Sequence, residues 1–391
     1  MRYYLFVFTV LLFLDACKKD DEDVTKNALS CDYFREARIL TNDPAKEVDY
    51  EINCVMEITD EIVIEEGVVI HFGPDAGILI KESGSLKIQG TADMPVKLTG
   101  ANKLKGFWKG ILIQSSSLNN SFSNVIIEFA GGQPFNSNND KASVILWSDS
   151  FLKMDNCKIE NSGSYGLSAV YNNTMLELND NVYNSCNEAP IKIIPSYMNR
   201  MDWRSSHAGN VKDIIEVEIN TDDIRNSVEW HALDVPYRVI SNYSGFDFLL
   251  IRQGLVTIKT GVLIEFSSGT GLYIDDNGGL NVDNPSDAVY FTGVVKQPGS
   301  WKGLYFQFSQ ANNVLDNVYI EYAGNLYDGA KHGIGMWGNP RLSIGSSKFS
   351  NIDGCAIIDF NNSEAAPNPN FNFFNNAIIY ENISNGAICY Q

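Results

Sequence analysis

The side chains best suited to proton transfer lie close together near the end of the chain, at Asp328, Lys331 and His332. A carboxylate, an amine and an imidazole are groups that general acid–base catalysis uses. A related stretch of the chain carries Asp140 and Lys141 at the corresponding place, which a polar turn explains equally well. We therefore expect no catalytic residues, with these three as the candidates if a reaction occurs.

No group of residues predicts a metal or a cofactor. Asp275 and Asp276 are neighbours at the end of an expected strand, so their side chains point apart and fit a turn better than a Ca²⁺ site. The sequence has no CxxC motif and no Cys/His cluster, which excludes the usual structural zinc sites. Ca²⁺ remains conceivable at carboxylates, but no pattern in the sequence supports it.

Aromatic side chains predict binding rather than catalysis. In residues 144–147 and 334–337 the alternation of side chains buries the positions before each tryptophan and turns the indole outward. Exposed indoles are surfaces on which sugar rings stack. The residues expected to bind glycans are aromatic or acidic and face outward: Trp147, Trp337, Phe135, Tyr327, Glu128 and Glu321. Alternatively, each indole packs on its own part of the fold. For Trp108 and Trp301, in Trp-Lys-Gly corners, we expect such packing.

The elements that position these residues belong to an internal duplication. Residues 63–193 are repeated as residues 256–390, so that Gly67 matches Gly261 and Trp108 matches Trp301. Short segments in both copies alternate apolar and polar residues, which is the period of a strand with one buried face. Within a copy, residues 159–162 recur about one coil later as residues 182–185.

Short strands, a repeat of roughly 23 residues and the absence of amphipathic helices predict three strands per coil. The chain is therefore expected to be all-β, a parallel β-helix of about 15 coils and roughly 70 Å length. We place the first copy at residues 31–205 and the second at 206–391, stacked as one continuous solenoid. Asn156, Asn161, Asn184 and Asn351 are expected at bends, because Asn tolerates the left-handed conformation.

Four sequence patterns extend this prediction: residues 66–72, the Trp-Lys-Gly corners, residues 127–131, and Trp230 followed by Pro236-Tyr237. With them the chain resembles the right-handed parallel β-helix repeat lipoproteins of the Gram-negative cell surface. The resemblance covers nearly the whole mature chain and implies a right-handed β-helix, but no particular activity. Polysaccharide lyases and hydrolases also use this fold. They need carboxylates on neighbouring coils or a base beside Ca²⁺, and no such set is evident in the sequence.

The first residues predict export and a lipid anchor. Residues 3–14 are apolar but too few to span a bilayer, as expected for a signal peptide at 1–16. Leu14-Asp15-Ala16-Cys17 resembles a lipobox, and Lys18-Lys19 followed by acidic residues resembles a tag for the outer face of the outer membrane. We expect a lipid on Cys17 and an acidic linker at 17–30. The alternative is an ordinary thiol and a solvated linker.

The formal net charge is −19 over 391 residues, and removing residues 1–16 leaves it unchanged. Without a basic stripe, nucleic acid is excluded as a partner, whereas a neutral glycan meets no repulsion. Six cysteines follow Cys17, and Cys31 with Cys54 is the one disulfide we predict.

These observations predict a surface-exposed lipoprotein that binds polysaccharide or another cell-surface glycan, on a host or a neighbouring cell, without catalysis. Duplication favours binding, because paired aromatic platforms raise avidity. A β-helix polysaccharide lyase or glycoside hydrolase, and a structural or adhesin stalk, are the alternatives. The sequence leaves the ligand and the oligomeric state open.

Overall fold

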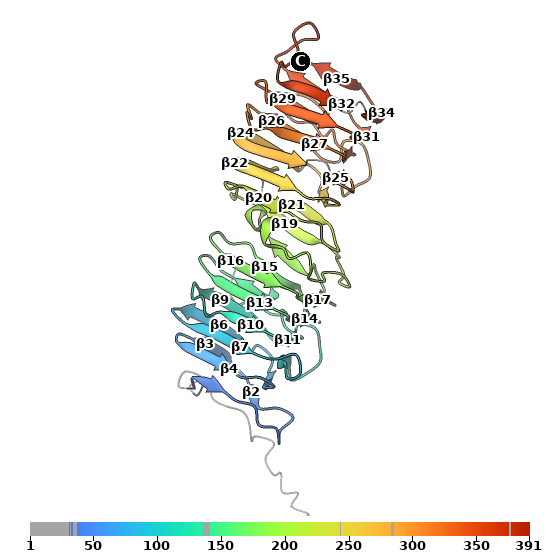
Figure 1. The fold of residues 1–391 in the computed structure, drawn as a ribbon. Helices are drawn as coiled ribbons and strands as arrows, with labels where there is room; N and C mark the ends of the chain where they lie inside the picture. Colours follow the sequence, from blue (N-terminus) through green and yellow to red (C-terminus); the bar gives the residue numbers. More distant parts are fainter. Residues whose placement is uncertain are drawn as a thin grey trace, which may run out of the picture.

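The computed structural model describes residues 31, 33, 37–135, 141–242, 244–282, 285–374 and 377–391. Short strands are stacked into an elongated rod, with the first described strands at one end of the rod and the last at the other (Figure 1). All pairings between named strands are parallel, and each strand pairs with strands of the adjacent coils. The fold is a parallel β-helix, as the two-residue alternation predicts.

Two six-stranded sheets belong to the first copy alone. Sheet A contains β2 (Tyr50–Ile52), β5 (Val69–Phe72), β8 (Val96–Gly100), β11 (Val125–Glu128), β14 (Lys158–Glu160) and β17 (Val182–Asn184). Sheet B contains β1 (Ile39–Leu40), β4 (Glu61–Ile64), β7 (Ser85–Gln89), β10 (Ser121–Ser123), β13 (Phe151–Asp155) and β16 (Met175–Asn179).

Sheet C is the longest sheet and runs through both copies. Its 13 strands are β3 (Val55–Ile58), β6 (Gly77–Glu82), β9 (Ile111–Ser115), β12 (Ala142–Leu146), β15 (Tyr165–Ala169), β18 (Ile191–Ile193), β19 (Ile215–Ile219), β21 (Tyr237–Ser241), β23 (Leu263–Phe266), β25 (Val289–Gly293), β28 (Val318–Glu321), β31 (Lys348–Ile352) and β34 (Ile379–Ile383). The two copies therefore form one continuous solenoid, while the number of about 15 coils stays a prediction.

Sheet D covers the rest of the second copy. Its strands are β20 (Val228–Trp230), β22 (Phe248–Ile258), β24 (Gly271–Val282), β26 (Leu304–Gln307), β27 (Asn313–Asp316), β29 (His332–Trp337), β30 (Leu342–Gly345), β32 (Cys355–Phe360), β33 (Phe371–Phe374) and β35 (Gly386–Tyr390). In β22 and β24 one long strand continues across the corner at which the first copy has two separate strands.

The second copy is rotated relative to the first by one strand position. Strands β6 and β12 lie in sheet C, but their equivalents β24 and β29 lie in sheet D. Sheet C is continued instead by β23 and β25, the equivalents of β5 and β8 from sheet A. Positions that match between the copies in sequence therefore lie on different faces of the rod.

The rotation arises in the segment between the copies, residues 194–236, which we call the joint. Sheets A and B end at β17 and β16, and the joint fills their places with the 3₁₀-helix η1 (Pro195–Arg200) and the single bridge of Ser206 to Val182. Among the sheets of the described residues, only sheet C crosses the joint without interruption, through β18, β19 and β21.

The core is a column of inward-facing side chains, mostly Ile, Leu and Val, that continues from Leu40 to Ile357. The corner tryptophans belong to it, as predicted. Trp108 is fully buried and stacks on Phe72 with ring centroids 4.0 Å apart, and its indole N–H donates to the carbonyl of Glu128 over 2.8 Å. Trp301 makes the equivalent contacts in the second copy.

Asparagines turn the coils at three of the four predicted bends. Asn156, Asn161 and Asn351 have φ of 54°, 56° and 57°, the left-handed conformation that Asn tolerates. Asn184 was predicted wrongly, since it ends β17 and the next residue, Ser185, takes the positive φ of 57°.

Two disulfides link neighbouring coils near the two ends of the described solenoid. Cys31 and Cys54 are bonded, which confirms the prediction, with Cα atoms 6.4 Å apart. Cys355 and Cys389 are also bonded, joining β32 to β35. The second pair is not evident when the two copies are aligned, because these cysteines have no Cys counterparts in the first copy. The bridge links neighbouring coils of the same copy. Cys157 and Cys186 are buried free thiols.

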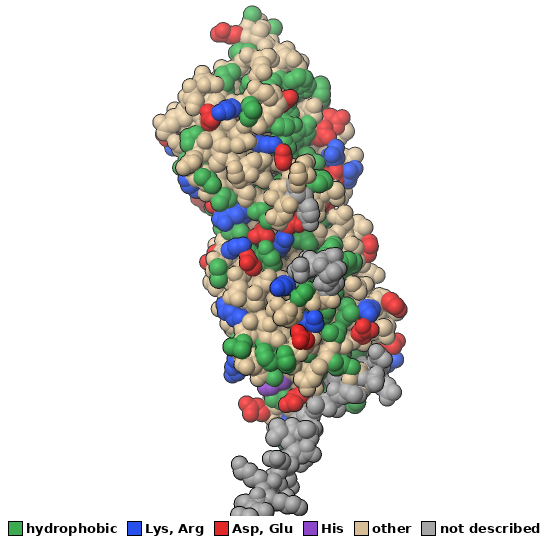
Figure 2. All heavy atoms as spheres, turned by 180° about the vertical axis from the view of Figure 1, so that it is seen from behind, with side chains coloured by type: hydrophobic (Ala, Val, Ile, Leu, Met, Phe, Trp, Pro, Cys, Tyr) green, Lys and Arg blue, Asp and Glu red, His purple; other side chains and the backbone are tan. Residues whose placement is uncertain are grey.

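The predicted signal peptide, the lipidated Cys17 and the linker lie outside the described residues. No helix in the described ranges is long and apolar enough to cross a membrane. On the face shown in Figure 2, acidic and basic side chains are interspersed with hydrophobic ones.

Candidate functional site

Each of the three candidates for proton transfer is held in a different contact. Asp328 accepts a hydrogen bond from the Tyr305 hydroxyl over 3.3 Å, and Lys331 forms an ion pair with Asp353 at 2.7 Å. The side chain of His332 is buried, and neither ring nitrogen has a partner among the described residues. The arrangement holds each group in a separate contact rather than aiming them at a shared substrate.

His332 is enclosed by aromatic rings. Its imidazole lies with its centroid 6.0 Å from the rings of Tyr305 and Phe360. Burial disfavours the charged imidazolium and lowers the pKa of His332 to about 4. The ring is therefore neutral at pH 7 and shielded from solvent, which suits packing better than catalysis.

The aromatic residues predicted to form platforms belong to two hydrophobic clusters on the outside of the sheets. The first lies outside sheet C and consists of Leu79, Leu112, Phe135, Ala142, Ile145, Trp147 and Tyr165. The second lies outside sheet D and consists of Tyr273, Tyr305, Tyr327, Ala330, Trp337, Ile358, Phe360 and Cys389. Phe135 thus joins Trp147 and Tyr327 joins Trp337, but the rotation of the second copy puts the two clusters on different sheets.

Each platform tryptophan is half-buried and leans on a ring of the next coil. Trp147 packs on Tyr171 with ring centroids 4.1 Å apart and planes tilted by 32°. Trp337 packs on Phe360 at 5.6 Å and 46°. Tyr171 is also half-buried, so that the first pair keeps partly open aromatic surface. Sequence reasoning missed Tyr171, although its spacing of one coil from Trp147 is a usable signal.

The two predicted acidic residues are already engaged within the protein. Glu128 is buried against Lys97, with the carboxylate and ammonium 2.8 Å apart. Burial alone would raise the pKa of Glu128, but the Lys97 ammonium outweighs it and lowers that pKa. Glu321 accepts hydrogen bonds from Thr292 and Ser350 over 3.2 and 3.4 Å. Neither carboxylate is placed as an open acceptor for a ligand.

A ladder of charges on the outside of sheet C was also missed by the sequence reasoning. Glu216 and Glu265 lie in register on either side of Arg238, so that one coil separates the two carboxylates. Glu265, however, forms an ion pair with Arg238 at 2.5 Å, and Glu216 accepts from the hydroxyl of Tyr165 over 2.7 Å. These partners compensate the carboxylates and leave a structural ladder.

A polar cleft opens at the joint, beside the Trp147–Tyr171 pair. This joint cleft has a volume of about 420 Å³ and is lined mainly by polar side chains from the end of the first copy and from the joint: Asn172, Asn173, Ser196, Tyr197, Thr221, Asp222, Asp223, Ile224, Arg225, Asn226 and Val228. Asn172 directly follows Tyr171, whose carbonyl accepts from the Tyr197 hydroxyl over 2.8 Å. The aromatic pair and the cleft therefore form adjoining surfaces.

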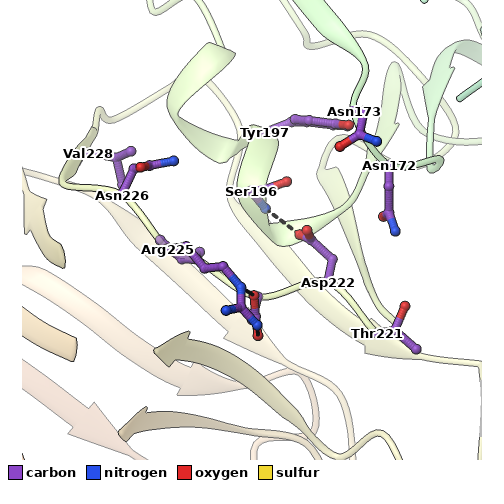
Figure 3. A pocket seen from close by; sticks show the side chains of 11 residues that line it. Asn172, Asn173, Ser196, Tyr197, Thr221, Asp222, Arg225, Asn226 and Val228 are labelled. Carbon is purple, nitrogen blue, oxygen red and sulfur yellow. Dashed lines mark hydrogen bonds and ion pairs between the residues drawn. The ribbon is translucent and has the colours of Figure 1, made fainter. Parts of the chain in front are cut away.

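Asp222 stands in the cleft between Arg225 on one side and Asn172 on the other (Figure 3). Its carboxylate accepts from the backbone N–H of Ser196 over 2.8 Å, and partial burial raises its pKa. Within the described part of the chain, no Lys or Arg forms an ion pair with Asp222. Asp223, in contrast, lies within 2.7 Å of both Arg225 and Arg252.

No group of three or more His, Cys, Asp or Glu side chains among the described residues is arranged to hold a metal ion. The sequence matches no protein-family model, and no curated protein is similar to it at a significant level. The candidate site therefore rests on its own geometry.

Proposed function

We propose that this protein is a surface-displayed, non-catalytic glycan-binding rod, held to the outer membrane by a lipid on Cys17. The observation that carries the proposal is the contact of two half-buried, mutually tilted rings, Trp147 and Tyr171, with a polar cleft beside them. Sugars present apolar ring faces and hydroxyl groups, so they are recognised by aromatic faces together with amides and carboxylates.

The partners that engage Asp328 and Lys331, and the burial of His332, support binding over bond cleavage, because proton transfer requires groups within hydrogen-bond reach of a common substrate. A polysaccharide lyase or hydrolase, and a purely structural stalk, remain as outcomes of the test below.

Binding and cleavage can be measured together on the chain freed of residues 1–17. The protein is incubated with plant, host and microbial polysaccharides, and both retention and newly formed reducing or unsaturated ends are recorded. We expect retention without products, reduced at least tenfold by Trp147→Ala. Trp337→Ala is the matched control, because this indole lies on another sheet away from the cleft, and it should change retention less than twofold.

Each other outcome selects another function. Released ends would identify an enzyme, and the absence of both signals would leave a stalk. Loss of retention with Trp337→Ala instead would move the site to sheet D. Metabolic labelling with a fatty acid, compared with Cys17→Ser, tests the anchor.

A further inference from the structure

We infer that the joint cleft binds an uncharged, hydroxyl-rich sugar unit and rejects anionic ones, with Asp222 as the residue that determines this specificity. The inference rests on the proposed glycan function and names the ligand class that the cleft accepts.

The size and lining of the cleft fit a small polar group. A volume of about 420 Å³ lies at the lower end of the range for small-molecule sites. Asn172, Asn173 and Asn226 bring amides, each of which both donates and accepts, and Thr221 adds a hydroxyl. This set can satisfy several hydroxyl groups that each act as donor and acceptor, as those of a mono- or disaccharide do.

The charges in the cleft disfavour anions. Asp223 is neutralised by Arg225 and Arg252, and these two arginines are in turn occupied by Asp223 and Asp275. Asp222 is left as the uncompensated charge of this group, with a backbone N–H as its partner. A carboxylate or sulfate entering the cleft meets this negative charge in a partly desolvated place, whereas a sugar hydroxyl can donate to it.

The cleft is built from the end of the first copy and from the joint, which explains why the duplication alone does not reveal it. Asn172 and Asn173 follow the last regular coils of the first copy, whereas Asp222 and Arg225 precede β20. No equivalent of the cleft is expected within either copy, since η1 and the residues that follow β19 occur once, in the joint.

Equilibrium binding to soluble tetrasaccharides tests this specificity on the chain freed of residues 1–17. The neutral probes are cellotetraose, maltotetraose and tetra-N-acetylchitotetraose, and the anionic probes are tetragalacturonate and tetramannuronate. We expect at least one neutral probe to bind tenfold or more tightly than either anionic probe. Asp222→Asn should reduce this preference at least fivefold. Asp93→Asn, an exposed carboxylate outside the cleft, is the matched control and should leave it unchanged.

A second variant separates loss of the site from loss of folding. Asn173→Gly removes the amide and keeps the left-handed conformation of this residue, whose φ is 61°. It should weaken the neutral probe at least threefold while the thermal midpoint stays within about 1 °C of the wild type, roughly the shift expected for 1 kcal/mol in a chain of this size. Equal or tighter binding of the uronates overturns the inference. So does binding that Trp147→Ala abolishes but neither cleft variant changes, and in that case the proposed function stands. If no probe binds the wild type, both fall.

Discussion

His332 and Gly335 form a compensated pair on the outer face of sheet D. A Cβ atom at position 335 would lie 2.7 Å from Cδ2 of Tyr305 and 2.9 Å from the imidazole of His332. In the first copy, Ala142 stands at the position of His332 and Ile145 at the position of Gly335. The large side chain therefore comes from the first position in the second copy and from the second position in the first copy. We interpret the imidazole as filling the space that the Ile145 side chain fills in the first copy.

This exchange predicts strong coupling between the two positions. Gly335→Ala should lower the free energy of unfolding by about 1–3 kcal/mol, because an added methyl group overpacks the cluster. In the double variant with His332→Ala the imidazole contact is gone and Tyr305 gains space to move away, so adding the same methyl group should cost less. Urea unfolding of the wild type, both single variants and the double variant measures the coupling. Additive effects would show that the two side chains do not share this space.

The depressed pKa of His332 predicts a loss of stability in acid. The unfolded chain takes up a proton near an ordinary histidine pKa of about 6.5, whereas the folded chain does so near 4. Stability is therefore fully present above about pH 6.5 and falls as the pH drops towards 4. Relative to His332→Leu, the wild type should lose about 2–3 kcal/mol more between pH 7 and 4.5 in denaturant unfolding. Parallel pH profiles would mean that this ring is not protonated on unfolding.

At the scale of the elements, the sequence predicted the buried faces of the strands and the buried corner residues, because both depend on residues that are close in the chain. Alternation at residues 125–129 gives one buried strand face, and the Trp-Lys-Gly corners place Trp108 and Trp301 in the core. The rotation between the copies could not be predicted, because it depends on how many strands the joint contributes, and the alternation is irregular there. The Trp147–Tyr171 contact was accessible through its spacing of one coil, but the cleft beside it depends on η1.

The disulfide between β32 and β35 predicts how the last coil behaves on reduction. The bridge closes a segment with a sequence separation of 34 residues, which corresponds to about 3–4 kcal/mol in the chain-entropy description. Several apolar side chains of this coil are only partly buried, among them Phe371, Tyr380 and Ile383. Cys355→Ser with Cys389→Ser should therefore release β33–β35 to a protease first, while β29 stays protected. Cys157→Ser, a free buried thiol, is the control. Cleavage spread evenly along the rod would contradict the prediction.

At the scale of the whole molecule, the joint is the weak point of the rod, because two of the sheets are interrupted there. The proposed ligand contacts residues before and after this interruption. Among the described sheets, sheet C alone crosses the joint as paired strands, whereas η1 and a few backbone hydrogen bonds around Ser206 replace the other two sheets. Backbone amides with few ladder partners open most readily, so hydrogen exchange should be faster in residues 195–204 than in β18, β19 and β21, which exchange as slowly as the copies on either side. A sugar held between Asn173 and Asp222 contacts both sides of this weak point, and binding to the folded form slows opening by mass action. Saturating neutral tetrasaccharide should therefore slow exchange in residues 195–226 several-fold and leave β5 and β30 unchanged, and Asp222→Asn should reduce that protection. Slowing spread uniformly over the rod would place the ligand elsewhere.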